Sequence, residues 1–132
     1  MAAIRKAGAL IIEERRLLIV KPKDKPFFIN PGGKYEREET PKQCLERELQ
    51  EELGISLRRF EYYGEYGLAR AAHSTLPLHL ELYLVWCEGV PRPASEIEQL
   101  AWMSREDYHA GTYIVAPSFD VFVPDLLRDR LL

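Results

Sequence analysis

The clearest pattern along the chain is the strict alternation of apolar and polar positions over residues 78–86. Leucine occupies every second position from 78 to 84, and His79, Glu81 and Tyr83 lie between the leucines. A period of two places alternate side chains on opposite faces of a strand. The segment is therefore predicted to be a strand with a buried leucine face, and His79 and Glu81 are expected to point away from that face.

Other apolar runs predict further strands, separated by charged or proline-containing segments. Two runs joined by four charged residues predict a hairpin whose turn is residues 13–16. Asn30, Pro31 and two glycines predict a sharp turn after a short apolar run. The strands expected from these patterns are residues 7–12, 17–21, 27–29, 60–66 and 97–103.

A repeat of leucine at every fourth position predicts the longest helix, residues 41–53. Thr40 can cap the first turn, Pro41 suits the first helical position, and Gln43 completes a capping box. The leucines at positions 45, 49 and 53 form a buried stripe, and Gly54 ends the helix.

Two more helices are expected towards the C-terminus. Ser104 starts a capping pattern that predicts a short helix over residues 104–109. A longer helix is expected from residue 117 to residue 132, with a kink or restart at Pro124, because proline cannot donate a backbone hydrogen bond.

Hairpins and helices without regular βαβ alternation predict an α+β or mixed-sheet sandwich. The length fits one domain, expected to span residues 1–132.

Composition and charge narrow the classes of protein that fit. Hydrophobic residues make up 46% of the chain and charged residues 30%, as in ordinary globular domains. The net charge of −3 argues against a nucleic acid or an anionic membrane as partner, since both favour a basic patch. Without a signal peptide or an apolar run long enough to span a bilayer, a cytoplasmic location is expected. Cys44 and Cys87 are expected to be buried free thiols.

The acidic residues of the longest predicted helix have a spacing that suits a metal ion. Glu48, Glu51 and Glu52 lie at i, i+3 and i+4, so their carboxylates share one helical face. Such a face often only contacts solvent, but like charges repel by about 0.2–0.5 kcal/mol per pair. A hard divalent cation such as Mg²⁺ takes oxygen ligands and would remove this repulsion. Gly32 and Gly33 would let a backbone carbonyl approach the same ion.

The wider pattern around these glutamates resembles the Nudix hydrolase box, here residues 33–55. Gly33 is followed after five residues by Glu39 and, after seven more, by the run Arg47-Glu48-Leu49-Gln50-Glu51-Glu52-Leu53-Gly54-Ile55. Every defining position of the box is present. The resemblance extends more loosely to the hairpin before the box, the alternating strand after it and residues 102–104.

The resemblance implies a fold and an activity. Nudix proteins are α/β/α sandwiches around a mixed β-sheet, and they hydrolyse nucleoside diphosphates linked to another moiety, with Mg²⁺ or Mn²⁺ activating water. By this resemblance, Glu48, Glu51 and Glu52 match the metal-binding and water-activating carboxylates. Glu48 is the favoured general base, Glu51 and Glu52 are the favoured metal ligands, and the carbonyl of Gly32 or Gly33 matches a backbone ligand.

The resemblance also implies supporting roles. Arg47 and Glu39 match positions that support the loop and the helix through an ion pair. Some members take another acidic ligand from a loop before a late tryptophan, and either Glu96 or Glu98 suits that role here.

Several side chains near the predicted mouth of the site are candidates for contact with a nucleotide. The lysines that are candidates to bind phosphate are Lys21 and Lys34, with Lys23 nearby. The tyrosines that either stack on a base or belong to the core are Tyr35, Tyr66 and Tyr83.

The substrate is indicated less clearly than the reaction. The ADP-ribose subgroup has a proline after the box where this chain has Ala71, although hydrolysis of ADP-ribose or another linked metabolite stays an alternative. Small MutT-like members, which act on nucleoside triphosphates or modified nucleotides, match best in length. Hydrolysis of 8-oxo-dGTP is a hypothesis, although the asparagine expected in the base pocket is absent around residues 116–120.

Three further questions stay open. A non-catalytic nucleotide sensor with this fold is one alternative, but such modules generally lose box carboxylates, and all are present here. An isopentenyl diphosphate isomerase is another, but it needs a reactive cysteine, whereas Cys44 lies inside the box helix. A homodimer is possible through the apolar segment 119–132, which can equally pack on its own sheet.

Overall fold

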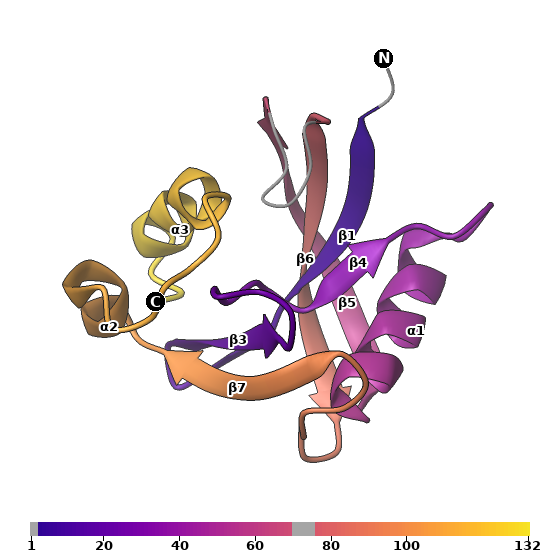
Figure 1. Cartoon of the computed structure of the whole chain (residues 1–132), viewed down its shortest axis with the longest axis horizontal. Helices are drawn as coiled ribbons and strands as arrows, with labels where there is room; N and C mark the ends of the chain where they lie inside the picture. The colour runs from indigo at the N-terminus through magenta and orange to yellow at the C-terminus, as the bar shows by residue number, and fades with distance from the viewer. Residues whose placement is uncertain (1–2, 70–75) are drawn as a thin grey trace.

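The computed structural model describes residues 3–69 and 76–132, which form a mixed sheet, an antiparallel sheet and three helices (Figure 1). The strands are β1 (Ile4–Leu10), β2 (Ile12–Glu13), β3 (Arg16–Pro22), β4 (Gly32–Lys34), β5 (Ser56–Leu68), β6 (Leu78–Glu88) and β7 (Ile97–Met103). The helices are α1 (Pro41–Leu53), α2 (Arg105–Ala110) and α3 (Phe119–Arg128). The α+β sandwich around a mixed sheet is confirmed. Ala71 lies outside the described residues.

β6 is the central strand of the fold. It pairs in parallel with β1 and antiparallel with β5, and the four-stranded sheet has the order β4-β1-β6-β5. Figure 1 shows α1 on one side of this sheet and α3 on the other. Leu80 and Leu82 of β6 pack in the cluster that contains α3, whereas Tyr83 and Val85 pack in the cluster that contains α1. The strict alternation therefore marks a strand covered on both faces.

Glu81 lies on the face of β6 that does not carry the leucines, as predicted, but this face is not open to solvent at Glu81. The residue is only 7% exposed. Tyr35 and Tyr83 donate hydrogen bonds to its Oε1 atom. A charged residue in an alternating pattern can thus be buried when hydroxyl groups satisfy its oxygens.

α1 begins and ends at the predicted residues. Thr40 and Gln43 form the capping box, and Gly54 ends the helix in the left-handed conformation at φ 65°. Leu45, Leu49 and Leu53 are fully buried. This stripe fixes the rotation of α1 on the sheet and so determines where Glu48 and Glu52, which are buried beside the stripe, point.

The predicted hairpin is shorter than expected, and the prediction was wrong about the partner of its first strand. Glu14 and Arg15 form the turn with positive φ angles of 50° and 61°, so the hairpin joins only β2 and β3. The preceding segment, β1, pairs with β4 and β6 in the other sheet. The chain changes sheets near Ile11, a change that a continuous apolar run does not reveal.

Segments 27–29 and 30–33 also differ from prediction. Phe28 and Ile29 make only isolated bridges, to Val115 and Val20, and no strand. Gly32 starts β4, which pairs antiparallel with β1. A strand was not expected in a glycine pair, but Gly32 has φ 129° and lies against the backbone of Ala7, where a side chain would not fit.

The C-terminal helix is shorter than predicted. α3 ends at Arg128, and Pro124 lies within the continuous helix without a restart. Proline removes one backbone donor, while buried residues of α3 on both sides of it, among them Phe122 and Leu126, pack against the sheet. The apolar C-terminal segment thus covers its own sheet.

Strand β5 is longer than the predicted 60–66, because its pairing with β6 continues through polar residues.

None of the helices in the described ranges is long and apolar enough to cross a membrane.

The packing of α3 on the sheet should be a main source of stability. Phe122 is fully buried, whereas its neighbour Val121 is 40% exposed. Phe122→Ala should lower the free energy of unfolding by about 3–5 kcal/mol, through lost burial and the cavity left behind. Val121→Ala is the matched control and should change it by less than about 1 kcal/mol. Urea denaturation measures both, and equal losses would show that α3 does not pack as described.

Candidate active site

Three carboxylates from two segments of the chain converge beside the Gly32–Gly33 backbone. Glu48 and Glu52 come from α1, and Glu96 comes from the loop before β7. One oxygen atom of each carboxylate lies within 4.8 Å of those of the other two. Glu48 is 9% exposed and Glu52 is 2% exposed, while Glu96 is exposed. We call these three residues the carboxylate cluster.

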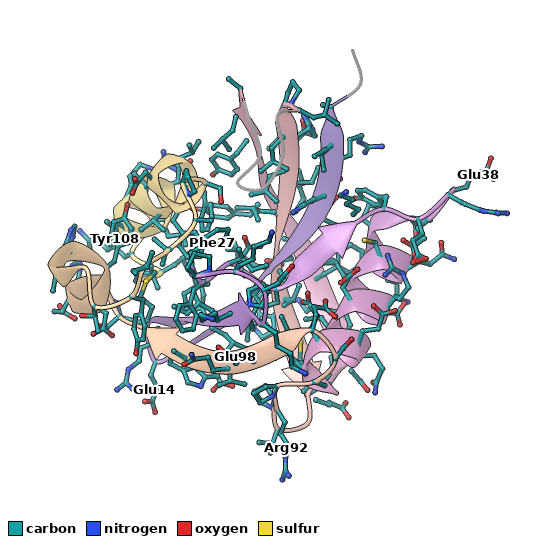
Figure 2. All side chains as sticks on the ribbon, viewed as in Figure 1. Glu14, Phe27, Glu38, Arg92, Glu98 and Tyr108 are labelled. Carbon is teal, nitrogen blue, oxygen red and sulfur yellow. The ribbon has the colours of Figure 1, made fainter. Side chains whose placement is uncertain are left out.

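The loop between β6 and β7 brings Glu96 to the cluster because it is tied to the end of α1. The backbone N–H groups of Arg92 and Ala94 donate to the carbonyl oxygens of Leu53 and Glu52, at 3.1 Å and 3.0 Å. Figure 2 shows Arg92 at the tip of this loop. The sequence left Glu96 and Glu98 equally suitable, and the structure places Glu96 in the cluster.

Glu98 is held elsewhere, by Lys21. Figure 2 shows Glu98 on β7, and the Nζ atom of Lys21 lies 2.8 Å from its Oε2 atom. The side chain of Lys21 is only 19% exposed, so this lysine would have to exchange a partner to bind phosphate.

The two glycines allow the backbone to touch both helical glutamates. The N–H of Gly32 donates to Oε1 of Glu52 at 3.0 Å. A Cβ atom on Gly33 would lie 2.5 Å from Oε1 of Glu48. Any larger residue at position 33 would therefore displace the Glu48 carboxylate.

The cluster concentrates negative charge, and little water reaches two of its members, Glu48 and Glu52. Burial is the main reason why the pKa of Glu52 rises to about 9; the nearby charges of Glu48 and Glu96 contribute to this rise, and the hydrogen bond from Gly32 opposes it. Burial also raises the pKa of Glu48, and a hydrogen bond from Arg47 offsets part of that rise. A cation among these oxygens would stabilise all three ionised carboxylates.

Arg47 makes the ion pair with Glu39 that the sequence predicts, and it also contacts Glu48. Its Nε and Nη2 atoms donate to the two oxygens of Glu39 at 2.7 Å and 2.8 Å. Its Nη1 atom donates to Oε1 of Glu48 at 2.8 Å. The hydrogen bonds from Arg47 are the main reason why the pKa of Glu39 falls to about 2. Arg47 thereby holds Glu48 in one orientation.

Glu51 stands apart from the carboxylate cluster. Its Oε2 atom lies 3.6 Å from Nη1 of Arg47, and its side chain is 49% exposed. The i, i+3, i+4 spacing therefore places Glu51 at the rim, while Glu48 and Glu52 face inward.

Lys34 and Lys6 lie near the cluster from neighbouring strands. They are opposite each other in the β1–β4 register, and Lys34 is exposed. The pKa of Lys6 is lowered, mainly by burial and also by the charge of Lys34. The carboxylates of Glu52 and Glu48 oppose part of this shift. Sequence reasoning missed Lys6, which lies outside the box and precedes an apolar run without any distinguishing pattern.

A pocket adjoins the cluster on the α3 side of the sheet. It lies between β1, β6, residues 29–33 and the start of α3, and it shares Gly32 and Gly33 with the cluster. Its polar side chains include Lys6, Asn30 and Ser118. Asn30 was interpreted only as part of a turn, so its place in a pocket was also missed.

The candidate tyrosines are engaged by other groups and do not line this pocket. Tyr35 donates to Glu81 at 2.5 Å, and Tyr66 donates to Asp125 at 2.6 Å. The ring of Tyr83 is buried and packs edge-on against Phe60. These contacts favour the alternative that the three tyrosines belong to the core and its edge, and they do not favour stacking on a base.

A second group of possible ligands consists of Glu65, His79 and Glu81. Here the buried carboxylate already has a cation, because Nη2 of Arg5 lies 2.6 Å from Oε2 of Glu81. Burial would raise the pKa of Glu81, but hydrogen bonds from Tyr35 and Arg5 outweigh it and lower the pKa. This group therefore has less need of a metal ion than the carboxylate cluster.

Both cysteines are free, but only Cys44 is buried as expected. Cys87 is half-buried, because it lies near the end of β6. Burial is the main reason why the pKa of Cys44 rises to about 12. Its thiol stays protonated at neutral pH and is unreactive, which argues against the isomerase alternative.

Comparison with known proteins agrees with this geometry. A family model described as the NUDIX domain matches residues 3–123. A MutT-like protein of Streptomyces ambofaciens is 30% identical over 101 residues, which are 76% of this chain and 63% of that protein. An 8-oxo-dGTP diphosphatase of Haemophilus influenzae is 33% identical over 84 residues, which are 63% of this chain and 59% of that protein. The chain spans about three fifths of the length of these relatives.

A solved structure shows the same fold over nearly the whole chain. A NUDIX hydrolase from Nitrosomonas europaea matches with a TM-score of 0.80, covering 97% of this chain and 90% of that chain. The two sequences are 18% identical, so this match concerns the fold.

The glycine at position 33 should be required for metal binding. Gly33→Ala should weaken Mn²⁺ affinity by about tenfold or more, because the new Cβ would displace the Glu48 carboxylate. Gly67→Ala is the matched control, since its Cβ would meet no atom closer than 3.9 Å. Isothermal titration with Mn²⁺ measures both variants. Unchanged affinity in Gly33→Ala would contradict the described contact with Glu48.

The pKa of Glu52 should make stability fall as pH rises when no metal is present. Its pKa is about 9 in the folded protein against an ordinary 4.5, so the folded state binds more protons between these two pH values. The Glu52 contribution to the free energy of unfolding therefore decreases from pH 4.5 to pH 9. Denaturation in EDTA should show this decrease in the wild type and a weaker one in Glu52→Gln. Parallel pH profiles for the two proteins would be inconsistent with a desolvated Glu52.

Proposed function

This chain belongs to the NUDIX domain family, and we propose that it is a divalent-metal-dependent hydrolase that cleaves the pyrophosphate linkage of a nucleoside diphosphate derivative. The observation that carries the proposal is the carboxylate cluster of Glu48, Glu52 and Glu96, packed against the Gly32–Gly33 backbone. Buried carboxylates at such close range are costly unless a cation compensates them.

The donor set fits Mg²⁺ or Mn²⁺. All three side chains offer carboxylate oxygens, which these hard cations prefer, and the buried Glu52 has a strongly raised pKa that a cation would bring down. We assign the ion to Glu48, Glu52 and Glu96, with Glu51 and a carbonyl of Gly32 or Gly33 as further ligands. A bound ion there would neutralise phosphate oxygens and acidify the attacking water.

The protein's own groups divide the remaining tasks. Arg47 donates one hydrogen bond to Oε1 of Glu48, which leaves a second lone pair of this oxygen for the ion. Oε2 is then the atom that would accept a proton from water as the general base. Arg47 and Glu39 together keep this orientation, so they act through Glu48 and do not need to touch the substrate. Lys6 and Lys34 lie beside the cluster and would bind the phosphate oxygens, while Lys21 would do so only after releasing Glu98.

The proposed substrates are nucleoside triphosphates or modified nucleotides. The MutT-like relative and the 8-oxo-dGTP diphosphatase that this chain resembles support that class. ADP-ribose and other linked metabolites form the second candidate class. A sensor without activity is disfavoured because every box carboxylate is present. The cytoplasmic location, the absence of nucleic-acid and membrane partners, and the homodimer stay predictions.

A product analysis tests the proposal. The protein is incubated with Mg²⁺ and, separately, nucleoside triphosphates, 8-oxo-dGTP, ADP-ribose, NADH and diadenosine polyphosphates, and the products are resolved by chromatography. We expect Mg²⁺-dependent release of a nucleoside monophosphate. Glu48→Gln and Glu52→Gln should lower kcat/KM by about a hundredfold or more, because each removes a group that acts on the reacting atoms.

The matched control is Glu46→Gln, which changes an exposed carboxylate on the same helix. It should leave kcat/KM within about twofold, since a surface charge away from the cluster is screened by solvent. Glu51→Gln is measured alongside to establish how far the rim carboxylate contributes. A wild-type protein that binds a nucleotide but releases no product, with or without metal, would contradict the proposal and favour the sensor.

A further inference from the structure

The pocket beside the carboxylate cluster contains two polar side chains whose hydrogen-bonding capacity is not fully used among the described residues. Asn30 is 9% exposed and Ser118 is 8% exposed. The hydroxyl of Ser118 does not cap α3 and makes no hydrogen bond in the described part of the chain. The Oδ1 atom of Asn30 likewise has no partner there, since its amide makes a single bond through Nδ2.

These unused groups face the pocket and not the protein interior. No fully buried side-chain oxygen or nitrogen among the described residues lacks a hydrogen-bond partner. The unpartnered Oδ1 of Asn30 therefore keeps an accessible surface, although the residue as a whole is nine-tenths buried. Because Asn30 and Ser118 both line the same pocket, that surface opens into it.

The orientation of the Asn30 amide is set by its surroundings. Nδ2 donates to the carbonyl oxygen of Pro31 at 3.1 Å, and the N–H of Ala9 donates to the same oxygen at 2.8 Å. Gly8 makes room for the amide, because a Cβ there would lie 2.3 Å from Nδ2. The nitrogen is thus committed to the backbone, and Oδ1 is the atom that remains for a ligand.

The other lining side chains are largely apolar. They include Ile29 and two buried leucines of β6, Leu78 and Leu80. Ligand pockets of this kind combine an apolar lining with a few polar groups that choose the ligand. The carboxylate cluster, whose bound ion would contact the phosphates, shares the Gly32–Gly33 edge, so a ring in this pocket belongs to a substrate whose phosphates reach that edge.

We propose that Asn30 determines the specificity of this protein, by accepting through Oδ1 a hydrogen bond from an N–H group on the base of a nucleotide substrate. The inference rests on the proposed function for the identity of the phosphate-bearing substrate. A hydrogen-bonding side chain in an apolar pocket discriminates strongly, because a ligand without the matching group leaves it desolvated and unpaired. Ser118 lies in the same pocket, and its hydroxyl offers a second polar contact to the base.

Asn30 is the only asparagine in the chain, which allows a direct test on the unaltered protein. Labelling the side-chain nitrogen of asparagine with ¹⁵N marks this one NH₂ group, and its pair of N–H peaks in a heteronuclear spectrum is the Asn30 signal. The probes are the nucleoside 5′-monophosphates of the four common bases and of 8-oxoguanine, with ribose 5-phosphate as the probe that lacks a base. We expect the signal to shift with at least one base and not with ribose 5-phosphate. Equal shifts with all probes, or no shift, would overturn the proposal.

Steady-state selectivity provides the second test. For Asn30→Leu we expect kcat/KM for the preferred triphosphate to fall about tenfold, mainly through KM, while poor substrates change little and the ratio between bases shrinks. Gln99→Leu, which removes an exposed amide on β7, should keep the wild-type ratio. A uniform loss for all bases in Asn30→Leu would mean that Asn30 has only a structural role.

The two tests separate this inference from the proposed function. If no nucleotide is hydrolysed, the proposed function fails, while base-dependent shifts of the Asn30 signal would still support the pocket. If nucleotides are hydrolysed but neither the signal nor the ratio depends on the base, the function stands and the assignment of Asn30 is wrong.

Discussion

The rest of the site depends on the desolvation of Glu52 beside other carboxylates. Glu52 is almost fully buried, and the Gly32 N–H is the one hydrogen-bond donor to its carboxylate in the described part of the chain. One N–H group cannot compensate a carboxylate charge in such surroundings. The fold nevertheless holds Glu52 there, through the leucine stripe of α1 and the loop hydrogen bonds at its end. Protonation of the carboxyl or a bound cation therefore stabilises this arrangement.

Two arrangements of a buried carboxylate in the same domain show the difference between structural and functional charge. Glu81 is compensated by Arg5 and by the hydroxyl of Tyr35, and its pKa is lowered. Glu52 has no comparable partner within residues 3–69 and 76–132, and its pKa is raised. The ion pair and hydrogen bonds of Glu81 satisfy its charge without any ligand. The charge of Glu52 is not satisfied in this way, so a metal ion that binds there would be stabilised by it.

The parts of the site that could be predicted from the sequence are the local ones. Capping residues, the leucine period and the spacing of Glu48 and Glu52 all act within one helix, and α1 has the predicted limits. Glu96 could not be distinguished from Glu98, because the choice depends on how the loop after β6 is tied to α1. Asn30 and Lys6 could not be found, because they meet only when β1 leaves its expected hairpin and pairs with β4 and β6. Pairing between distant segments leaves little trace in a single sequence.

The most direct test of the central claim is the position of a bound ion. A crystal of the protein soaked in Mn²⁺ would locate the metal by anomalous scattering. The account predicts a peak at roughly 2.1 Å from carboxylate oxygens of Glu48 and Glu52, with Glu96 beside it. A peak only at Glu65, His79 and Glu81, or none at the carboxylate cluster at saturating Mn²⁺, would contradict the account.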